Sequence, residues 1–140
     1  MAERVARVEV FSITIPRETP YLGALREGER INDHGYIVRK GNRTVYPTVD
    51  RTVVVRIETA NGAVGWGEAT PTPRWTYETT ETIVSTLRKY LAPAVKGIEI
   101  WNFDALHRAM DRAISPGVTP GSPLAKSAID VAAWTTVSTS

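Results

Sequence analysis

The stretch Thr52–Ala69, TVVVRIETANGAVGWGEA, decides the fold of this chain. The run Val53–Glu58 places apolar residues at every second position, which is the pattern of a half-buried strand. Asn61-Gly62 then predicts a tight turn, because both residues tolerate positive φ. The returning strand contains Gly65 and Gly67, and glycines inside a strand indicate a bulge or the close approach of another backbone. The stretch therefore predicts a β-hairpin.

Further strand signals lie before this hairpin. Val5–Ile15 predicts a first strand, and Glu18–Asp50 predicts a long connection, of the kind that is usually functional or disordered. Within the connection, Tyr36–Arg39 and Arg43–Tyr46 flank a glycine-containing turn and indicate a second, smaller hairpin. The part Glu18–Asp33 is expected to be a mobile loop.

After the hairpin the apolar period changes from 2 to 3.6, which predicts a helix. We expect Thr76 to cap it, Glu78 and Glu81 to lie in its first turn, and Pro93 to end it. Its predicted buried stripe is Ile83, Val84, Leu87, Tyr90 and Leu91.

Two more helices are predicted in the last third of the chain. One starts near Asn102, with an apolar stripe of Phe103, Leu106, Met110 and Ala113. The other starts at Ser122-Pro123, a serine cap followed by proline at the first helical position, and is apolar nearly all round up to Trp134. We expect such a helix to be buried on several sides. Lys126 and Asp130 in this helix have the spacing of an i,i+4 ion pair.

Strands that precede helices indicate the α+β class. The prediction is a three-stranded antiparallel meander followed by a three-helix bundle, with a long loop and an extra hairpin between strands one and two. At 140 residues the chain is long enough for one core.

Composition narrows the function classes. Lys and Arg number 17 against 15 acidic residues, and they are interspersed along the chain, so nucleic-acid binding is disfavoured. The absence of cysteine excludes disulfides and thiolate zinc sites. No apolar run approaches the ~20 residues of a membrane span, and the N-terminus has no signal-peptide pattern, so we expect a cytoplasmic protein with no membrane partner.

Three pieces, in this order and spacing, resemble one family. They are VVVRIETANGAVGWGEA at Val53–Ala69, YLAPAVKG at Tyr90–Gly97 and AKSAIDVAAW at Ala125–Trp134. Together they resemble the N-terminal capping domain of the enolase superfamily, in its mandelate racemase and muconate lactonizing enzyme branch. The resemblance covers nearly the whole chain.

The resemblance implies a magnesium-dependent enzyme that abstracts the proton α to a carboxylate. In the family, the bases and the three acidic metal ligands belong to a (β/α)8 barrel of ~250 residues. They have no counterpart positions here, so no catalytic residue and no metal ligand is assigned. Residues 1–134 are interpreted as the capping domain and residues 135–140 as a tail outside the family pattern, made of poor helix formers. The barrel is interpreted as a missing partner domain.

The resemblance also implies that two loops, Glu18–Asp50 and Thr70–Tyr77, close over the barrel mouth and shape the pocket. The candidate substrate-binding residues on them are Tyr21, Leu22, Arg74, Trp75 and Tyr77. For the first two, the alternative is packing on the sheet. For Trp75, the alternative is a hydrophobic staple against the first helix.

Other polar residues are interpreted as structural. His34 lies in a turn-like sequence without a second metal ligand nearby, and His107 lies opposite an apolar stripe, as a solvated residue does. Glu68, at a strand end, is expected in a buried pair with an arginine. Lys126 would need a cleft and a lowered pKa to act in catalysis.

The sequence therefore predicts the substrate-specificity domain of a racemase, cycloisomerase or sugar-acid dehydratase, inert without its barrel and prone to self-association. Its substrate would be a small carboxylate-bearing molecule. The alternative is a stand-alone α+β binding module without catalysis. The apolar third helix discriminates between them, since it needs a partner or leaves an exposed apolar patch.

Overall fold

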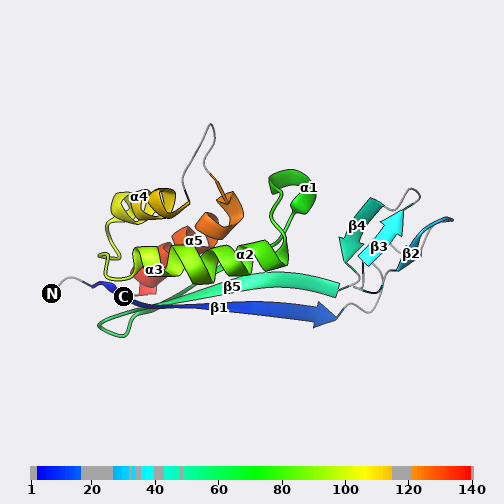
Figure 1. Cartoon of the computed structure of the whole chain (residues 1–140). Helices are drawn as coiled ribbons and strands as arrows, with labels where there is room; N and C mark the ends of the chain where they lie inside the picture. Colours follow the sequence, from blue (N-terminus) through cyan, green and yellow to red (C-terminus); the bar gives the residue numbers. More distant parts are fainter. Residues whose placement is uncertain are drawn as a thin grey trace. The chain divides into compact units, whose positions relative to one another are not determined.

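The computed structural model describes residues 3–16, 27–31, 33, 36–39, 43–47, 49–114 and 121–139 (Figure 1). The chain divides into two compact units. One consists of Met1–Ser12 together with Thr52–Ser140, and the other of Ile13–Arg51. The first unit contains the hairpin and the helices, and it is the unit that positions the candidate site.

The predicted meander is confirmed. Its strands are β1 (Val5–Pro16), β5 (Val49–Thr59) and β6 (Val64–Ala69), in the order β1-β5-β6 and antiparallel. The turn between β5 and β6 is closed by a hydrogen bond of 3.0 Å from the Gly62 N–H to the Thr59 carbonyl. Gly62 has a φ of 89°, which explains why a glycine stands there.

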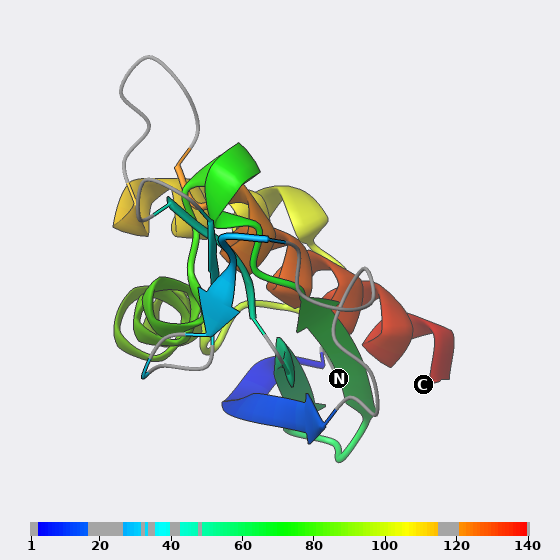
Figure 2. The ribbon, with the colours of Figure 1, turned by 90° about the vertical axis from the view of Figure 1, so that its right-hand side faces the viewer.

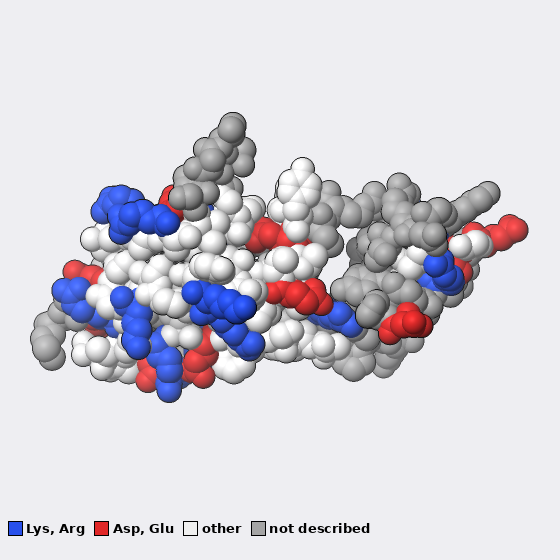
Figure 3. Space-filling view, in the orientation of Figure 1, with Lys and Arg blue, Asp and Glu red and all other residues white. Residues whose placement is uncertain are grey.

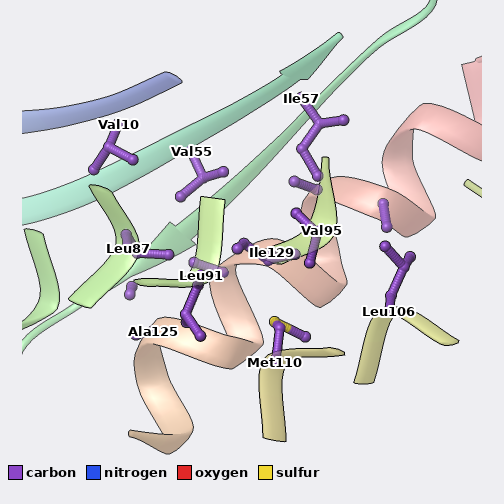
Figure 4. Packing of buried hydrophobic residues seen from close by; sticks show 14 of the residues in the cluster. Val10, Val55, Ile57, Leu87, Leu91, Val95, Leu106, Met110, Ala125 and Ile129 are labelled. Atoms are coloured by element: carbon purple, nitrogen blue, oxygen red, sulfur yellow. The ribbon is translucent and has the colours of Figure 1, made fainter. Parts of the chain in front are cut away.

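The helices cover one face of this sheet (Figures 1 and 2). They are α1 (Pro73–Thr76), α2 (Thr80–Thr86), the π-helical turn η1 (Leu87–Leu91), α3 (Ala92–Val95), α4 (Phe103–Ala113) and α5 (Pro123–Thr139). The core lies between sheet and helices, with Val55 and Ile57 from β5 meeting Leu91, Met110 and Ile129 (Figure 4). All five side chains are 0% exposed. The α+β class is thereby confirmed.

The first predicted helix differs from expectation at both ends. Its cap is Thr79 instead of Thr76: the Thr79 hydroxyl accepts a hydrogen bond from the Thr82 N–H, and the Thr82 hydroxyl accepts one from the Thr79 N–H. Pro93 does not end the helix: it follows a π turn and lies at the start of α3, where the fixed φ of proline suits a helix. The chain stays helical to Val95.

The π turn also changes the buried stripe. The fully buried positions are four apart: Ile83, Leu87, Leu91 and Val95. In η1 the Ala92 N–H donates to the Leu87 carbonyl, five residues back, so the turn is wider than in an α-helix. This wider turn keeps residues four apart on the core side. Tyr90, predicted to be in the stripe, is instead 52% exposed.

The second predicted helix is confirmed as α4. The Asn102 side chain accepts a hydrogen bond of 3.1 Å from the Ala105 N–H and so caps the helix as expected. Leu106 and Met110 are buried, and Phe103 and Ala113 pack against the core. The sequence Ser115-Pro116-Gly117, which favours the end of this helix, lies outside the described residues.

Glycines in β6 let α5 approach the sheet closely. A Cβ placed on Gly65 would overlap the Ala132 carbonyl oxygen, and one on Gly67 would overlap the Ala128 carbonyl oxygen. Both helix residues are 0% exposed alanines. The interpretation of these glycines as positions of close backbone approach is therefore confirmed, and the approaching backbone is that of α5.

The end of α5 contradicts the expected poor helix formation after Trp134. The helix continues to Thr139, and Thr136 is fully buried. The Thr135 hydroxyl accepts a hydrogen bond of 2.8 Å from the Trp66 N–H and lies 2.9 Å from the Trp66 carbonyl oxygen. The threonines thus place small side chains against the glycines of β6 and hydroxyl groups that hydrogen-bond to the edge of that strand. These tertiary contacts override their low helix propensity.

Two side-chain contacts between polar residues join α4 to α5. Lys126 donates to Asp111 at 2.8 Å, and His107 Nε2 lies 2.7 Å from an Asp130 carboxylate oxygen. The predicted Lys126–Asp130 pair is therefore wrong, since each residue takes its partner from the other helix. His107 is exposed as expected, but it is hydrogen-bonded rather than only solvated.

On the outer face of the sheet, acids and arginines form a network. Arg56 lies 2.8 Å from Glu58 and 2.7 Å from Glu9, and Arg7 lies 2.6 Å from Glu58. The hydrogen bond from Arg56, followed by that from Arg7, holds the pKa of Glu58 below its usual value. The bond to Glu58 raises the pKa of Arg56. On the face drawn in Figure 3, basic and acidic side chains likewise lie interspersed.

The second unit contains the expected small hairpin. β3 (Tyr36–Arg39) pairs antiparallel with β4 (Arg43–Pro47), and a short strand β2 (Arg30–Ile31) pairs with β3 on its other side. The part of the chain expected to be a loop therefore contributes a strand. Arg39 in β3 forms an ion pair of 3.1 Å with Glu29, which precedes β2.

Candidate functional site

The loop Thr70–Tyr77, here called the recognition loop, connects β6 to the joint before α2. It contains the single helical turn α1. The N–H groups of Trp75 and Thr76 both donate to the Thr72 carbonyl, at 2.9 and 3.0 Å. Tyr77 ends the turn with a φ of 66°, a left-handed conformation that a non-glycine residue adopts infrequently. The loop thus has a defined internal geometry.

The recognition loop presents two large aromatic side chains to solvent. Trp75 is 80% exposed and Tyr77 is 86% exposed. The alternative that Trp75 is a staple packed against the following helix is therefore wrong. Arg74 lies in α1, and its side chain is outside the described part of the chain. Tyr21, Leu22 and His34 also lie outside the described residues. The structure therefore shows Trp75 and Tyr77 exposed on the same loop and leaves the first loop's candidates untested.

The recognition loop is held at its N-terminal end by the sheet. Ala69, the last residue of β6, pairs with Val53 of β5. The buried Thr52 hydroxyl donates to the Ala69 carbonyl at 3.3 Å. Glu68, by contrast, is exposed and accepts a hydrogen bond of 3.4 Å from the Thr70 hydroxyl, so its expected burial with an arginine is wrong.

The loop is held at its C-terminal end by a buried carboxylate. Glu78 is 7% exposed, and its two oxygens accept hydrogen bonds from the N–H groups of Leu124 and Ala125, at 2.9 and 3.0 Å. Sequence reasoning placed Glu78 in the first turn of the following helix, which is wrong. Its partners lie 46 and 47 positions away, so no local pattern could reveal them.

Two buried hydroxyl oxygens lie in the loop without a hydrogen-bond partner among the described residues. They belong to Thr72 and Thr76. Buried polar atoms are nearly always hydrogen-bonded, to protein or to ordered water. Ordered water is therefore the expected partner of these two oxygens, which are shielded from bulk solvent.

The described residues do not fit a metal centre. Among them, no group of three or more His, Cys, Asp or Glu side chains could hold an ion. Glu9 and Glu58 lie close together, but both are engaged by arginines. None of the described helices combines the length and apolar character that crossing a bilayer requires.

Several known proteins are similar to this chain in fold and sequence. An enolase superfamily member from Agrobacterium tumefaciens has a solved structure that matches 98% of this chain and 34% of its own, with a TM-score of 0.76 and 42% identity. The L-Ala-D/L-Glu epimerase of Bacillus subtilis is 29% identical over 131 residues, which are 94% of this chain and 29% of the epimerase. The dipeptide epimerase of Enterococcus faecalis V583, solved with Mg and L-Leu-L-Tyr, matches 96% of this chain and 30% of its own, with a TM-score of 0.65 and 25% identity.

The chain thus spans about a third or less of the length of these relatives. Residues 39–138 match the family described as "Mandelate racemase / muconate lactonizing enzyme, N-terminal domain". The match includes the hairpin, the recognition loop and all the helices through most of α5. The resemblance inferred from three sequence pieces is confirmed, and the chain belongs to the mandelate racemase / muconate lactonizing enzyme N-terminal domain family of the enolase superfamily.

Proposed function

We propose that this chain is the capping and substrate-recognition domain of an enzyme that removes the proton α to a carboxylate. Racemisation, epimerisation, cycloisomerisation and dehydration all follow from that step. Family membership supports the proposal, as does the name of a relative, L-Ala-D/L-Glu epimerase. The substrate would be a small carboxylate-bearing molecule.

The observation that carries the proposal is the recognition loop. Two aromatic side chains are exposed on a loop whose ends are held by buried hydrogen bonds. Aromatic side chains can bury 150–250 Å² each, so leaving them in water forgoes a large apolar stabilisation. A loop that presents them in a defined geometry is suited to contact a ligand. Lid loops of this kind exclude water from the reacting groups and set specificity.

We assign the proton-transfer groups and the Mg²⁺ ligands to a barrel domain, because the described residues here do not provide a ligand set. A relative was solved with Mg and a dipeptide, which supports magnesium dependence for the complete enzyme. In this proposal the isolated chain binds no metal and is inert, and the complete enzyme is cytoplasmic. The exposed Val131 and Trp134 on α5 provide apolar surface for the barrel or for a second copy of the chain.

The test uses proton exchange. The purified chain is incubated with MgCl2 and L-Ala-L-Glu in D2O, and loss of the α-proton signals is followed by NMR. We expect no exchange above the buffer rate. A chimera in which this chain replaces the matching first part of the Bacillus subtilis epimerase is expected to restore exchange.

In the chimera, Trp75→Ala and Tyr77→Ala are each expected to raise KM by about tenfold, the factor that corresponds to about 1.4 kcal/mol of lost binding. Tyr90→Ala is the matched control, since Tyr90 is an exposed aromatic on a helix outside the loop. Exchange by the isolated chain, or an active chimera whose KM ignores both loop substitutions, would overturn the proposal.

A further inference from the structure

We propose that Glu78 is a positioning residue: its carboxylate fixes the recognition loop to the first turn of α5, so that Trp75 and Tyr77 are presented in one orientation. The value of that orientation for substrate binding rests on the function proposed above. The fixation itself is a property of this chain and can be measured without substrate.

The first turn of α5 requires partners that the helix cannot supply. The opening N–H groups of any helix have no intrahelical acceptor. Here Pro123 has no N–H, and the first regular helical bond runs from the Lys126 N–H to the Ser122 carbonyl at 3.1 Å. The remaining two, from Leu124 and Ala125, both donate to Glu78. The carboxylate therefore replaces the serine cap expected from sequence.

The two oxygens of the Glu78 carboxyl group match the two backbone donors at this point. Each oxygen accepts one backbone N–H, so both ends of the carboxyl group are used. The N-terminus of a helix also carries partial positive charge from its aligned peptide dipoles. These interactions compensate for the near-complete burial of the Glu78 side chain.

Glu78 stands where three elements meet. Tyr77 before it ends α1 in a left-handed conformation, and Thr79 after it caps α2. A change in the direction of the chain at position 78 is passed to Tyr77 through one peptide unit. The backbone hydrogen bonds of α1 are local to the loop, and the hydrogen bonds described between this joint and α5 are those accepted by Glu78.

The recognition loop, Glu78, α5 and β6 form a closed ring of contacts. The recognition loop leaves β6 after Ala69 and returns to α5 through Glu78. α5 in turn packs its alanine backbone directly on Gly65 and Gly67 of β6. The loop therefore starts and ends on two elements that are packed against each other, and removing the carboxylate opens the ring at one place.

The experiment compares Glu78→Gln and Glu78→Asp with the unmodified chain. Glu81→Gln serves as the matched control, because Glu81 is an exposed carboxylate three residues further on. Loop order is read from the rate of chymotrypsin cleavage after Trp75 and Tyr77, identified by mass spectrometry. Amide hydrogen exchange is read by NMR at Leu124 and Ala125 and at the buried Met110.

For Glu78→Gln we expect loop cleavage to rise about tenfold, and exchange at Leu124 and Ala125 to rise by a similar factor, with Met110 unchanged. Glu78→Asp keeps the charge and should recover part of the protection. Glu81→Gln should match the unmodified chain.

Faster exchange at Leu124 and Ala125 with unchanged loop cleavage would make Glu78 only a cap of α5, and would overturn the proposal. Loss of protection at Met110 in both variants would make it a residue of global folding, with the same consequence. Neither readout needs substrate or a barrel, so an inactive chimera would count against the proposed function and leave this result standing.

Discussion

Adding one methyl group to Gly67 should destabilise this domain strongly. In an open strand, Gly→Ala is stabilising by about 0.5–1 kcal/mol, because glycine loses more backbone entropy on folding. Here the new Cβ would overlap the Ala128 carbonyl oxygen and lie 2.9 Å from the Ala132 nitrogen. Both are helix backbone atoms, so no side-chain rotation can relieve the contact.

The expected magnitude follows from that geometry. Overpacking a core costs roughly 1–3 kcal/mol when side chains can adjust, and here α5 itself must shift. We expect Gly67→Ala to lower the free energy of unfolding by about 3 kcal/mol. A domain of this size has about 5–15 kcal/mol in total, so the loss is a large fraction. It corresponds to a fall in Tm of about 10 °C.

The assay is thermal and urea unfolding followed by circular dichroism, with Gly62→Asn as the control. Gly62 has a positive φ and nothing within 4 Å of an added Cβ, and asparagine tolerates that backbone conformation. The control should therefore lose less than about 1 kcal/mol. If Gly67→Ala is as stable as the control, α5 does not rest on the glycine backbone and the reasoning is wrong.

Three further outcomes are expected. Thr135→Val removes the hydroxyl that is hydrogen-bonded to the edge of β6. It should lower the free energy of unfolding by about 1–3 kcal/mol and give concentration-dependent association in light scattering. Ser138→Ala, at an exposed position, should change neither stability nor association. Asp111→Ala leaves the buried Lys126 ammonium without its carboxylate partner, and should lower the free energy of unfolding in urea by about 3 kcal/mol. Adding Lys126→Met should recover part of that stability. If the double variant recovers none, the pairing is refuted. The pKa of Glu58 is lower in the folded state than in the unfolded state. The contribution of Glu58 to folding stability is therefore fully present above its unfolded-state pKa and is lost as the pH falls through its folded-state pKa. In Arg56→Gln, NMR titration should show Glu58 protonating at higher pH than in the unmodified chain.

Local patterns in the sequence determined the elements that local forces control. The Asn61-Gly62 turn, the strands beside it and α4 with its Asn102 cap all agree with prediction. Each depends on residues within about four positions of one another, where periodicity and capping act. The pieces around these elements also indicated the family correctly.

Spacing alone misplaced the first long helix. A 3.6-residue period predicts Tyr90 inside and a stop at Pro93, whereas the π turn puts Tyr90 outside and carries the helix to Val95. The π turn accompanies the full burial of Leu87, Leu91 and Val95 against the rest of the core. That burial depends on the sheet beneath the helix, which no window of sequence contains.

The candidate site also has features that local sequence determines and features that depend on the tertiary structure. The sequence by itself determined that a loop with Trp75 and Tyr77 follows the hairpin, because strand and helix periods end on either side of it. Only the tertiary structure decided what holds that loop, since Glu78 binds amides 46 and 47 positions away and α5 rests on Gly65 and Gly67. Hydrogen bonds and close packing act through space, so partners distant in sequence become neighbours only when the whole chain has folded.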